Sequence, residues 1–337
     1  MASYLVTGGA GCVGSHLVEY LIKNNHKITI IDTLVYEKQS KIILSELLDK
    51  HPEIGFYKID LVDKDLVMDF FVNHSFDGIF HLAALPSHRV SLSFPYEYFQ
   101  NDLKATVNIL EAIRCVCPNV PILFTSTNKV YSDKETFVSE ESQLDAKGPY
   151  AISKLQSEEW CKFYANKFGL KVIVTRLFHV VGSRMQPKRE IPVFLKTIIE
   201  KGTIHLHGKF DLKNEFVSAY FGYTNVYDTV SGIYLLMSKR DELPDFSIFN
   251  IGSDQKFPVS EVLKNIFRFY GSECPVINTP LMEHETIGCV AKSEKLLKLG
   301  WKIEYNVQDA ISDYVNWYIN FFTENKADKK RFRGDLF

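Results

Sequence analysis

The stretch "LVTGGAGCVGSH", residues 5–16, decides the fold because it joins an apolar run to an amphipathic helical pattern through spaced glycines. Gly8, Gly11 and Gly14 follow a G-x-x-G-x-x-G spacing. Gly8 permits a tight turn, Gly11 lets the backbone approach a pyrophosphate, and Gly14 lets the helix pack closely on the strand. The N-terminus of that helix offers amide hydrogens to phosphate oxygens. The pattern predicts a dinucleotide-binding loop, and the alternative is a purely structural glycine turn.

Two carboxylates follow the next predicted strands. Asp32 ends the second strand, "KITIID", where it can bond both hydroxyls of an adenine ribose and would repel a 2′-phosphate. We therefore expect NAD rather than NADP as the cofactor. Asp60 ends the third strand, "GFYKID", where it can either bond the adenine amine or cap the following helix. The sequence leaves both roles of Asp60 open.

The rhythm of the chain indicates an α/β fold. Apolar strands alternate with helical patterns, which is typical of a doubly wound, Rossmann-type parallel sheet covered by helices. After about residue 179 this alternation breaks and proline, glycine and histidine become frequent. We expect residues 1–178 to form the NAD-binding domain, with residues 222–252 returning to it. Residues 179–221 and 253–325 then form a smaller, mixed α/β substrate-binding domain, and residues 326–337 form a tail.

Composition and charge exclude several classes of protein. The formal net charge of −2 argues against a general nucleic-acid binder, and the basic cluster Lys329, Lys330, Arg331 and Arg333 is interpreted as part of a solvated tail. The six cysteines show no metal-binding or paired spacing, so we expect free thiols and no metal site. No apolar run approaches the length of a membrane span. We expect a soluble, cytoplasmic protein without a membrane partner.

Tyr150 and Lys154 lie at positions i and i+4 of the predicted helix "YAISKLQSEEWCKFYANKF", so they share one helix face. A free tyrosine has a pKa of about 10, so a general base near neutrality needs a pKa lowered by about three units. The positive charges of Lys154 and of a nicotinamide ring could supply that bias. By itself the spacing is common on helices. After the glycine loop and the polar strand end "FTST", residues 124–127, it predicts catalysis on an oxidisable hydroxyl.

At this point the chain resembles the extended short-chain dehydrogenases/reductases, in their NAD-dependent nucleotide-sugar epimerase/dehydratase group. The resemblance spans nearly the whole chain and rests on "TGGAGCVGSHL", "HLAALPSHRVSL", "ATVNILEA", "FTSTNKVYSD", "YAISK", "RLFHVVGSR" and "LKLGW". It implies that a tyrosinate, Tyr150, takes a proton from a sugar hydroxyl, usually at C4, while hydride passes to NAD. Thr127 would hold the reacting oxygen, with adjacent Ser126 the weaker candidate, and Lys154 would bind the nicotinamide ribose.

The resemblance also implies the surroundings of the two ligands. Cofactor contacts are expected from the glycine loop and the ends of the first strands, namely Gly8, Gly11, Cys12, Val13, Gly14, Asp32, Asp60, Leu61, Leu82, Ala83 and Ala84, together with Tyr150 and Lys154. Substrate contacts are expected from Ser87, His88, Arg89, Asn128, His179, Arg184, Lys188 and Arg189. For His88 and His179 a structural role stays open, and His81 is interpreted as a structural histidine. The resemblance further implies a homodimer built from helices near residues 98–117 and 150–168.

The chain departs from the family pattern at several positions. The family's 4,6-dehydratases carry Asp and Glu after the threonine, whereas this chain has Asn128 and Lys129, which cannot act as that acid and base. Two arginines that usually hold the diphosphate are absent, and Phe221 stands at one of their positions. Asp102 replaces a usual asparagine and Val181 a frequent tyrosine.

These departures favour one reaction over its neighbours. The sequence predicts an NAD-dependent nucleotide-sugar epimerase that works through a transient 4-keto sugar. The alternatives are a C4 dehydrogenase, a 4,6-dehydratase with other acid and base groups, a related enzyme acting on a non-nucleotide sugar, and a non-catalytic NAD-binding regulator.

Overall fold

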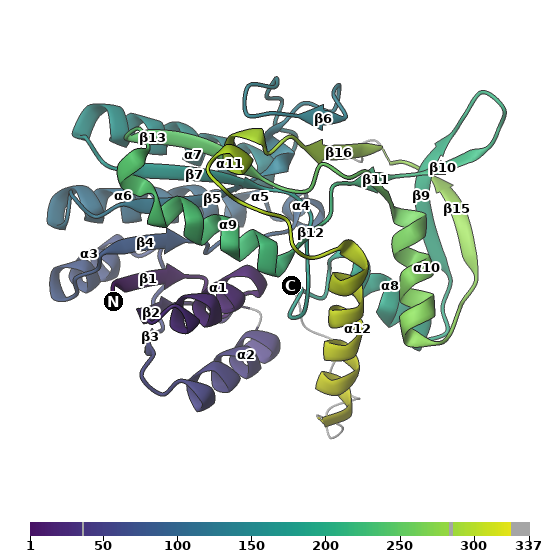
Figure 1. Ribbon diagram of the computed structural model, residues 1–337, viewed down its shortest axis with the longest axis horizontal. Coiled ribbons are helices and arrows are strands. Elements are labelled where there is room, and N and C mark those ends of the chain that lie inside the picture. Colours follow the sequence, from purple (N-terminus) through teal and green to yellow (C-terminus); the bar gives the residue numbers. More distant parts are fainter. Residues whose placement is uncertain (36, 283–285, 325–337) are drawn as a thin grey trace.

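A seven-stranded parallel sheet forms the centre of the computed structural model, which describes residues 1–35, 37–282 and 286–324 (Figure 1). The predicted tail, residues 326–337, lies outside the described residues, as does its basic cluster. Along the sheet the strands run in the order β3-β2-β1-β4-β5-β7-β13, with every pair parallel. Their bounds are β1 (Ser3–Thr7), β2 (Lys27–Ile31), β3 (Gly55–Tyr57), β4 (Gly78–His81), β5 (Ile122–Thr127), β7 (Val172–Leu177) and β13 (Phe246–Ile251).

Helices cover both faces of this sheet, which confirms the predicted doubly wound α/β fold. One face packs against α1 (Cys12–Lys23), α2 (Glu37–Lys50), α9 (Val226–Ser238) and α11 (Glu294–Lys298). The other face packs against α3 (Lys64–Asn73), α6 (Ala105–Val116) and α7 (Pro149–Phe168). Because α9 and β13 belong to this layer, the chain returns to the sheet after leaving it at β7.

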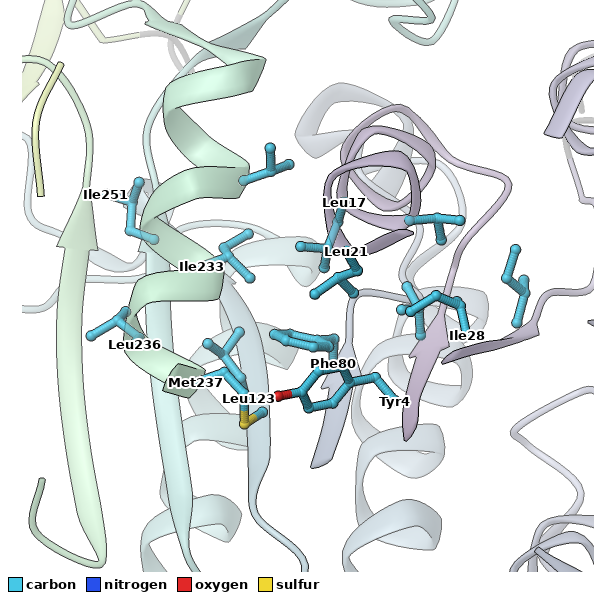
Figure 2. Close-up of a cluster of buried hydrophobic side chains, with 14 of the residues drawn as sticks. Tyr4, Leu17, Leu21, Ile28, Phe80, Leu123, Ile233, Leu236, Met237 and Ile251 are labelled. Atoms are coloured by element: carbon cyan, nitrogen blue, oxygen red, sulfur yellow. The ribbon is translucent and has the colours of Figure 1, made fainter. Parts of the chain in front are cut away.

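The first face holds a core of interlocking apolar side chains (Figure 2). Leu17 and Leu21 of α1 point toward Ile233 of α9, with Phe80 and Leu123 rising from the strands beneath them. All five side chains are fully buried. Burial of one such side chain contributes roughly 1.5–3 kcal/mol, so this layer fixes α1, and with it the glycine loop, on the sheet.

The remaining strands form three smaller sheets. One is three-stranded in the order β10-β9-β15, one four-stranded in the order β14-β11-β16-β6, and the last pairs β12 with β8. The strands are β6 (Phe137–Val138), β8 (Val180–Val181), β9 (Ile204–Phe210), β10 (Phe216–Ser218), β11 (Tyr220–Phe221), β12 (Thr224–Asn225), β14 (Phe257–Pro258), β15 (Val276–Pro280) and β16 (Gly288–Ala291). The three-stranded sheet lies on one side of the main sheet (Figure 1). Three helices lie there with it: α8 (Glu190–Ile199), α10 (Val259–Tyr270) and α12 (Val307–Glu324).

Two helical regions differ from the sequence analysis. The segment of α2 received no prediction, although its buried Ile43, Leu44 and Leu47 follow a helical period. The helix expected near residues 98–117 is present, but it begins with α5 (Pro95–Tyr98) and contains an unpredicted π-helical turn, η1 (Phe99–Lys104), before α6. A further short helix, α4 (His88–Ser91), precedes it. Short 3₁₀ turns complete the fold at η2 (Asn128–Val130) and η3 (Arg240–Glu242).

All six cysteines lie in the part of the chain that the structure describes. All six cysteines are free, and Cys12, Cys161 and Cys289 are buried. Across the part of the chain that the structure describes, no helix is both long enough and apolar enough to cross a membrane.

Candidate active site

A cleft of about 470 Å³ opens at the carboxyl ends of the parallel strands. The strand order reverses between β1 and β4, so the loops after these two strands diverge to opposite faces and leave a crevice between them. The cleft is lined by residues that follow β1, β2, β3, β4, β5 and β7, and by the first turns of α7 and α8. Such a crevice is where open α/β sheets bind their ligands.

The glycine loop forms one wall of this cleft. Gly8 has a left-handed φ of 73°, and a Cβ there would lie 2.8 Å from the Ala83 amide nitrogen. A Cβ on Gly14 would lie 2.1 Å from the carbonyl oxygen of Gly8, so α1 can approach β1 this closely only with glycine. Gly11 is the N-cap of α1, and Gly8, Gly11, Cys12, Val13 and Gly14 all line the cleft. This bare backbone at a helix N-terminus fits a pyrophosphate.

Asp32 and Asp60 both line the cleft beyond this loop. Asp32 accepts hydrogen bonds from the backbone of Ala10 at 3.0 Å and of Leu34 at 2.7 Å, and burial raises its pKa. Asp60 accepts from the backbone of Val62 at 2.9 Å. The N-cap of α3 is Asp63, so the capping role considered for Asp60 is wrong. The remaining predicted cofactor contacts, Leu61, Leu82, Ala83 and Ala84, also line the cleft.

Strand β5 delivers the polar sequence "STN" to the middle of the cleft. Ser126, Thr127 and Asn128 are all buried, and all three line the cleft. The Ser126 hydroxyl donates to the carboxylate of Glu158 at 2.5 Å. Thr127 Oγ1 accepts from the backbone of Lys129 at 3.3 Å, and its hydroxyl has only a long bond of 3.5 Å to the side-chain oxygen of Asn128. Because the hydroxyl hydrogen of Ser126 is committed to a carboxylate, Thr127 is the better placed of the two for a substrate oxygen.

The first turns of α7 bring Tyr150 and Lys154 to the same cleft. Pro149 occupies the first turn of α7, where its missing amide hydrogen costs nothing. The Tyr150 ring meets that of Tyr98 edge to face at 6.0 Å. Lys154 is buried, its ammonium donates to the carbonyl oxygen of Thr125 at 2.9 Å, and burial lowers its pKa. Tyr150, Lys154 and Thr127 therefore face one cavity from two elements.

Aromatic side chains build the far end of the cleft. The His179 ring stacks on Phe221 with centroids 3.9 Å apart, and the Lys129 ammonium lies 5.8 Å from the centre of the Phe221 ring. Burial, aided by Lys129 and Arg189, holds the pKa of His179 well below its ordinary value, so this imidazole is neutral. Its Nδ1 is buried without a hydrogen-bond partner. A neutral ring with an unbonded nitrogen at the wall of a cleft suits contact with a ligand hydroxyl.

The structure brings all but one of the predicted substrate contacts to this end. Ser87, His88, Arg89, Asn128, His179, Lys188 and Arg189 line the cleft. Arg184 is the exception and does not line it. Its guanidinium forms a bidentate ion pair with Glu19 of α1, with both bonds at 2.9 Å, and its backbone has a left-handed φ of 64°. The prediction that Arg184 contacts substrate is therefore withdrawn.

Tyr223 and Glu190 are among the lining residues that the sequence analysis did not propose. Tyr223 meets the His179 ring edge to face and donates through its hydroxyl to Glu190 at 2.6 Å. Glu190 stands in the first turn of α8, where a carboxylate is favoured by the helix dipole for structural reasons alone. No local pattern distinguishes this acid from an ordinary helix start. His81 is buried and bonded to Thr7 and Thr106, in agreement with the structural role expected for it.

Comparison with known proteins adds an independent observation. The profile of the NAD dependent epimerase/dehydratase family matches residues 4–252. A bifunctional UDP-glucose 4-epimerase and UDP-xylose 4-epimerase of Arabidopsis thaliana is 29% identical, and the match covers 93% of this chain and 94% of that protein. The predicted family, and NAD as the cofactor on which it depends, are confirmed by the family match.

Solved structures show the same architecture. The UDP-glucose 4-epimerase of Thermus thermophilus in complex with NAD has a TM-score of 0.81 and 26% identity, over 94% of this chain and 99% of that one. The UDP-glucose 4-epimerase of Stenotrophomonas maltophila reaches a TM-score of 0.87 over 96% of this chain and 100% of that one. At 23% identity the second likeness supports the fold alone.

Proposed function

The chain belongs to the NAD dependent epimerase/dehydratase family, and we propose that it epimerises a nucleotide sugar by oxidising a hydroxyl-bearing carbon, C4, and reducing it again. The observation that carries the proposal is the convergence of Thr127, Tyr150 and Lys154 on the cleft that the glycine loop and Asp32 also line. The arrangement places a general base (Tyr150), a hydroxyl that can bind the reacting oxygen (Thr127) and a cation (Lys154) beside a dinucleotide site.

Each of these residues has a separate task in the proposed cycle. Bound NAD supplies a group that can accept a hydride and return it. Tyr150 takes the proton of the substrate hydroxyl as the carbon loses its hydride, and the C–O single bond becomes a carbonyl. Thr127 holds that oxygen, and the charge of Lys154 favours the tyrosinate. When hydride returns to the opposite face of the carbonyl, Tyr150 gives its proton back to the oxygen, so no atom is gained or lost.

The acids of the cleft favour epimerisation over loss of water. Asp32, Asp60 and Glu190 are the carboxylates among its described lining residues. Asp32 and Asp60 lie at the dinucleotide end, and Glu190 accepts a hydrogen bond from Tyr223. Next to Thr127 stand Asn128 and Lys129, neither of which can serve as a carboxylic acid. Elimination needs an acid and a base beside the reacting carbons, and this end of the cleft offers amide and ammonium groups instead.

Basic side chains at the cleft mouth provide a substitute for the family's missing arginines. Arg89, Lys188 and Arg189 line the cleft. The Arg189 guanidinium is close enough to the Cys12 thiol and the His179 ring to influence the pKa of both. It thus lies between the glycine loop and the aromatic end, and we assign the substrate diphosphate to Arg189 with Lys188 beside it. Guanidinium groups suit that task because they bind phosphate oxygens in pairs.

A substrate panel tests the proposal. UDP-, GDP-, CDP- and dTDP-sugars are incubated with the protein and followed by NMR, while absorbance reports reduction of the bound cofactor. We expect one of them to give an isomer of unchanged mass. Tyr150→Phe should lower turnover by roughly 10²–10⁴-fold. Tyr164→Phe is the matched control, because Tyr164 lies on the same helix and bonds Glu111 instead.

Other outcomes of the panel point to other functions. A product that differs in mass from its substrate indicates a dehydrogenase or a dehydratase. If no sugar gives a product and none reduces the cofactor, the proposal is contradicted, and a non-catalytic NAD-binding protein is favoured.

We also propose that α6 and α7 form a homodimer interface. Trp160, Phe163 and Phe168 are exposed on α7, although aromatic side chains of this size are normally covered. Their rings contact one another and Tyr164, so they present one apolar ridge. Light scattering on the eluting protein measures the state, and a monomer at all concentrations would contradict the assignment.

A further inference from the structure

Asp102 is a buried carboxylate that the proposed cycle does not use. It lies in the π-helix η1 and is 0% exposed. Its Oδ1 accepts from the backbone of Leu85 at 2.9 Å, whereas its Oδ2 is buried and has no hydrogen-bond partner. π-Helical turns are rare and often occur at functional sites. A carboxylate left half unbonded in such a turn needs an explanation, because buried polar atoms are normally paired.

Asp102 stands directly behind the wall of the cleft. It does not line the cleft itself, but Leu85, which bonds it, does, as do Asn101 and Ala105 on either side of it in the chain. On the facing helix, α7, Lys154 is the charged group that acts on it. Of the three ammonium donors of Lys154, one goes to Thr125, and its charge lies 4.7 Å from the centre of the Phe124 ring. Ser157 of α7 donates to the carbonyl oxygen of Asp102 at 3.3 Å, which ties the two helices together. The Asp102 carboxylate and the Lys154 ammonium are therefore opposite charges that act on each other beside the cleft, at the residue expected to bind the nicotinamide ribose.

The other titratable groups around Asp102 do not compete for this role. From β4, His81 stays neutral, because burial lowers its pKa to about 3. From α7, Glu158 is held by Arg176 and Ser126, and burial keeps Cys161 a thiol by raising its pKa. Tyr150 faces the cleft one turn before Lys154 on the same helix. Lys154 is thus the partner through which Asp102 can act.

We propose that Asp102 is a positioning residue that sets the charge at the nicotinamide end of the cleft: its ionised carboxylate holds Lys154 in the charged form and favours the positively charged, oxidised nicotinamide over the neutral, reduced one. The reason is electrostatic. A negative charge in a buried setting attracts NAD⁺, whose ring is cationic, and leaves NADH, whose ring is neutral, nearly unaffected. The inference rests on the NAD-binding half of the proposed function and needs no sugar substrate.

The proposal makes the discrimination between NAD⁺ and NADH depend on pH. Burial raises the pKa of Asp102 to about 6, although Lys154 works against that rise. The carboxylate therefore ionises between about pH 5 and about pH 8. Over this interval the affinity for NAD⁺ should rise relative to that for NADH. Groups that face the adenine, the riboses and the phosphates affect both forms alike, so they cancel in the ratio of the two dissociation constants.

The test compares this ratio in three proteins at about pH 5 and about pH 8. In the wild type we expect the preference for NAD⁺ to grow on the order of tenfold. Asp102→Asn keeps an oxygen to accept from Leu85 but cannot ionise, so its ratio should change with pH markedly less than that of the wild type. Asp228→Asn is the matched control, because Asp228 is also buried with a raised pKa, yet both of its oxygens are bonded, to the backbones of Glu304 and Tyr305. Its ratio should follow the wild type.

Each other outcome has a defined meaning. A pH dependence in Asp102→Asn as large as that of the wild type belongs to Lys154 or Tyr150 and overturns the inference. If Asp102→Asn does not fold, the wild-type ratio decides, and a flat wild-type ratio overturns the inference. Failure of the wild type to bind either NAD⁺ or NADH contradicts the proposed function instead, so the two failures are distinguishable.

Discussion

Lys154 and Glu158 lie one turn apart on α7, and both side chains are 2% exposed, yet their charged groups have very different sets of bonding partners. Glu158 receives a bidentate ion pair from Arg176, with its shortest bond at 2.6 Å, and a further hydrogen bond from Ser126. Arg176 in turn reaches Tyr131, whose hydroxyl donates to Asn250. The Lys154 ammonium donates to one carbonyl oxygen and lies over one aromatic ring. Its charged neighbour Asp102 has one carboxylate oxygen without a hydrogen-bond partner.

The difference shows that one helix carries two kinds of buried charge, one that stabilises the fold and one that serves the cleft. A buried charge whose polar atoms are all bonded holds elements together, and the Glu158 network ties α7 to β5, β7 and β13. A buried charge with spare donors or acceptors at the wall of a cleft is held ready for a ligand. Removing one kind should therefore damage folding, and removing the other should damage catalysis and cofactor binding.

The largest effect is expected from Lys154→Met. Turnover of the substrate found by the panel should fall roughly 10³-fold, or about 4 kcal/mol of barrier, because the tyrosinate loses its nearest cation. The free energy of unfolding should change by less than about 1 kcal/mol, because methionine fills the space without a buried charge. Denaturant unfolding measured beside the kinetics checks both numbers. A loss of stability equal to that of an Arg176 variant would erase the distinction drawn above.

The second effect concerns the bonded pair. Arg176→Met leaves the Glu158 carboxylate buried without its partner and should lower the free energy of unfolding by about 3–5 kcal/mol. Adding Glu158→Leu should recover much of that loss, since an apolar pair of similar volume removes the unpaired charge. Denaturant midpoints of the single and double variants measure the coupling. Equal instability of both would show that the pair does not act as one unit.

The third effect sharpens the contrast at Asp102. Its pKa in the folded protein, about 6, lies above the ordinary value of 3.8, so the folded state prefers the protonated acid. Its contribution to stability is present below about pH 4 and is lost as pH rises through 6. At about pH 8 the free energy of unfolding of Asp102→Asn should therefore exceed that of the wild type by up to about 3 kcal/mol. Near pH 4 this advantage should disappear. Denaturant unfolding at the two pH values measures the difference. A variant less stable than the wild type at both values of pH would mean that the ionised carboxylate is not costly.

Particular residues show how far the sequence alone could reach. The glycine loop, Asp32, Thr127, Tyr150 and Lys154 all follow strand ends or share a helix face, and parallel strands bring such ends to one edge. Their meeting in one cleft was therefore predictable from local patterns. The spacing of apolar residues, which is also a local pattern, predicted the sheet and its covering helices.

Other features depend on contacts that no local pattern encodes. The π-helix that contains Asp102 changes the helical period, which a count of apolar spacings cannot foresee. Arg184 follows the family's motif, but its ion pair with Glu19, far earlier in the chain, takes it from the cleft. Tyr223 and Glu190 meet across separate elements, so neither could be assigned from its own surroundings in the sequence.

In the proposed cycle, this cleft oxidises a sugar carbon and reduces the same carbon within one binding event. The most direct measurement uses the nucleotide sugar identified by the panel, carrying deuterium on C4, with the reaction run in ordinary water. We expect an epimer of unchanged mass that keeps the deuterium on C4, because the hydride leaves and returns without entering solvent. Deuterium lost to water, or a product of different mass, would contradict it.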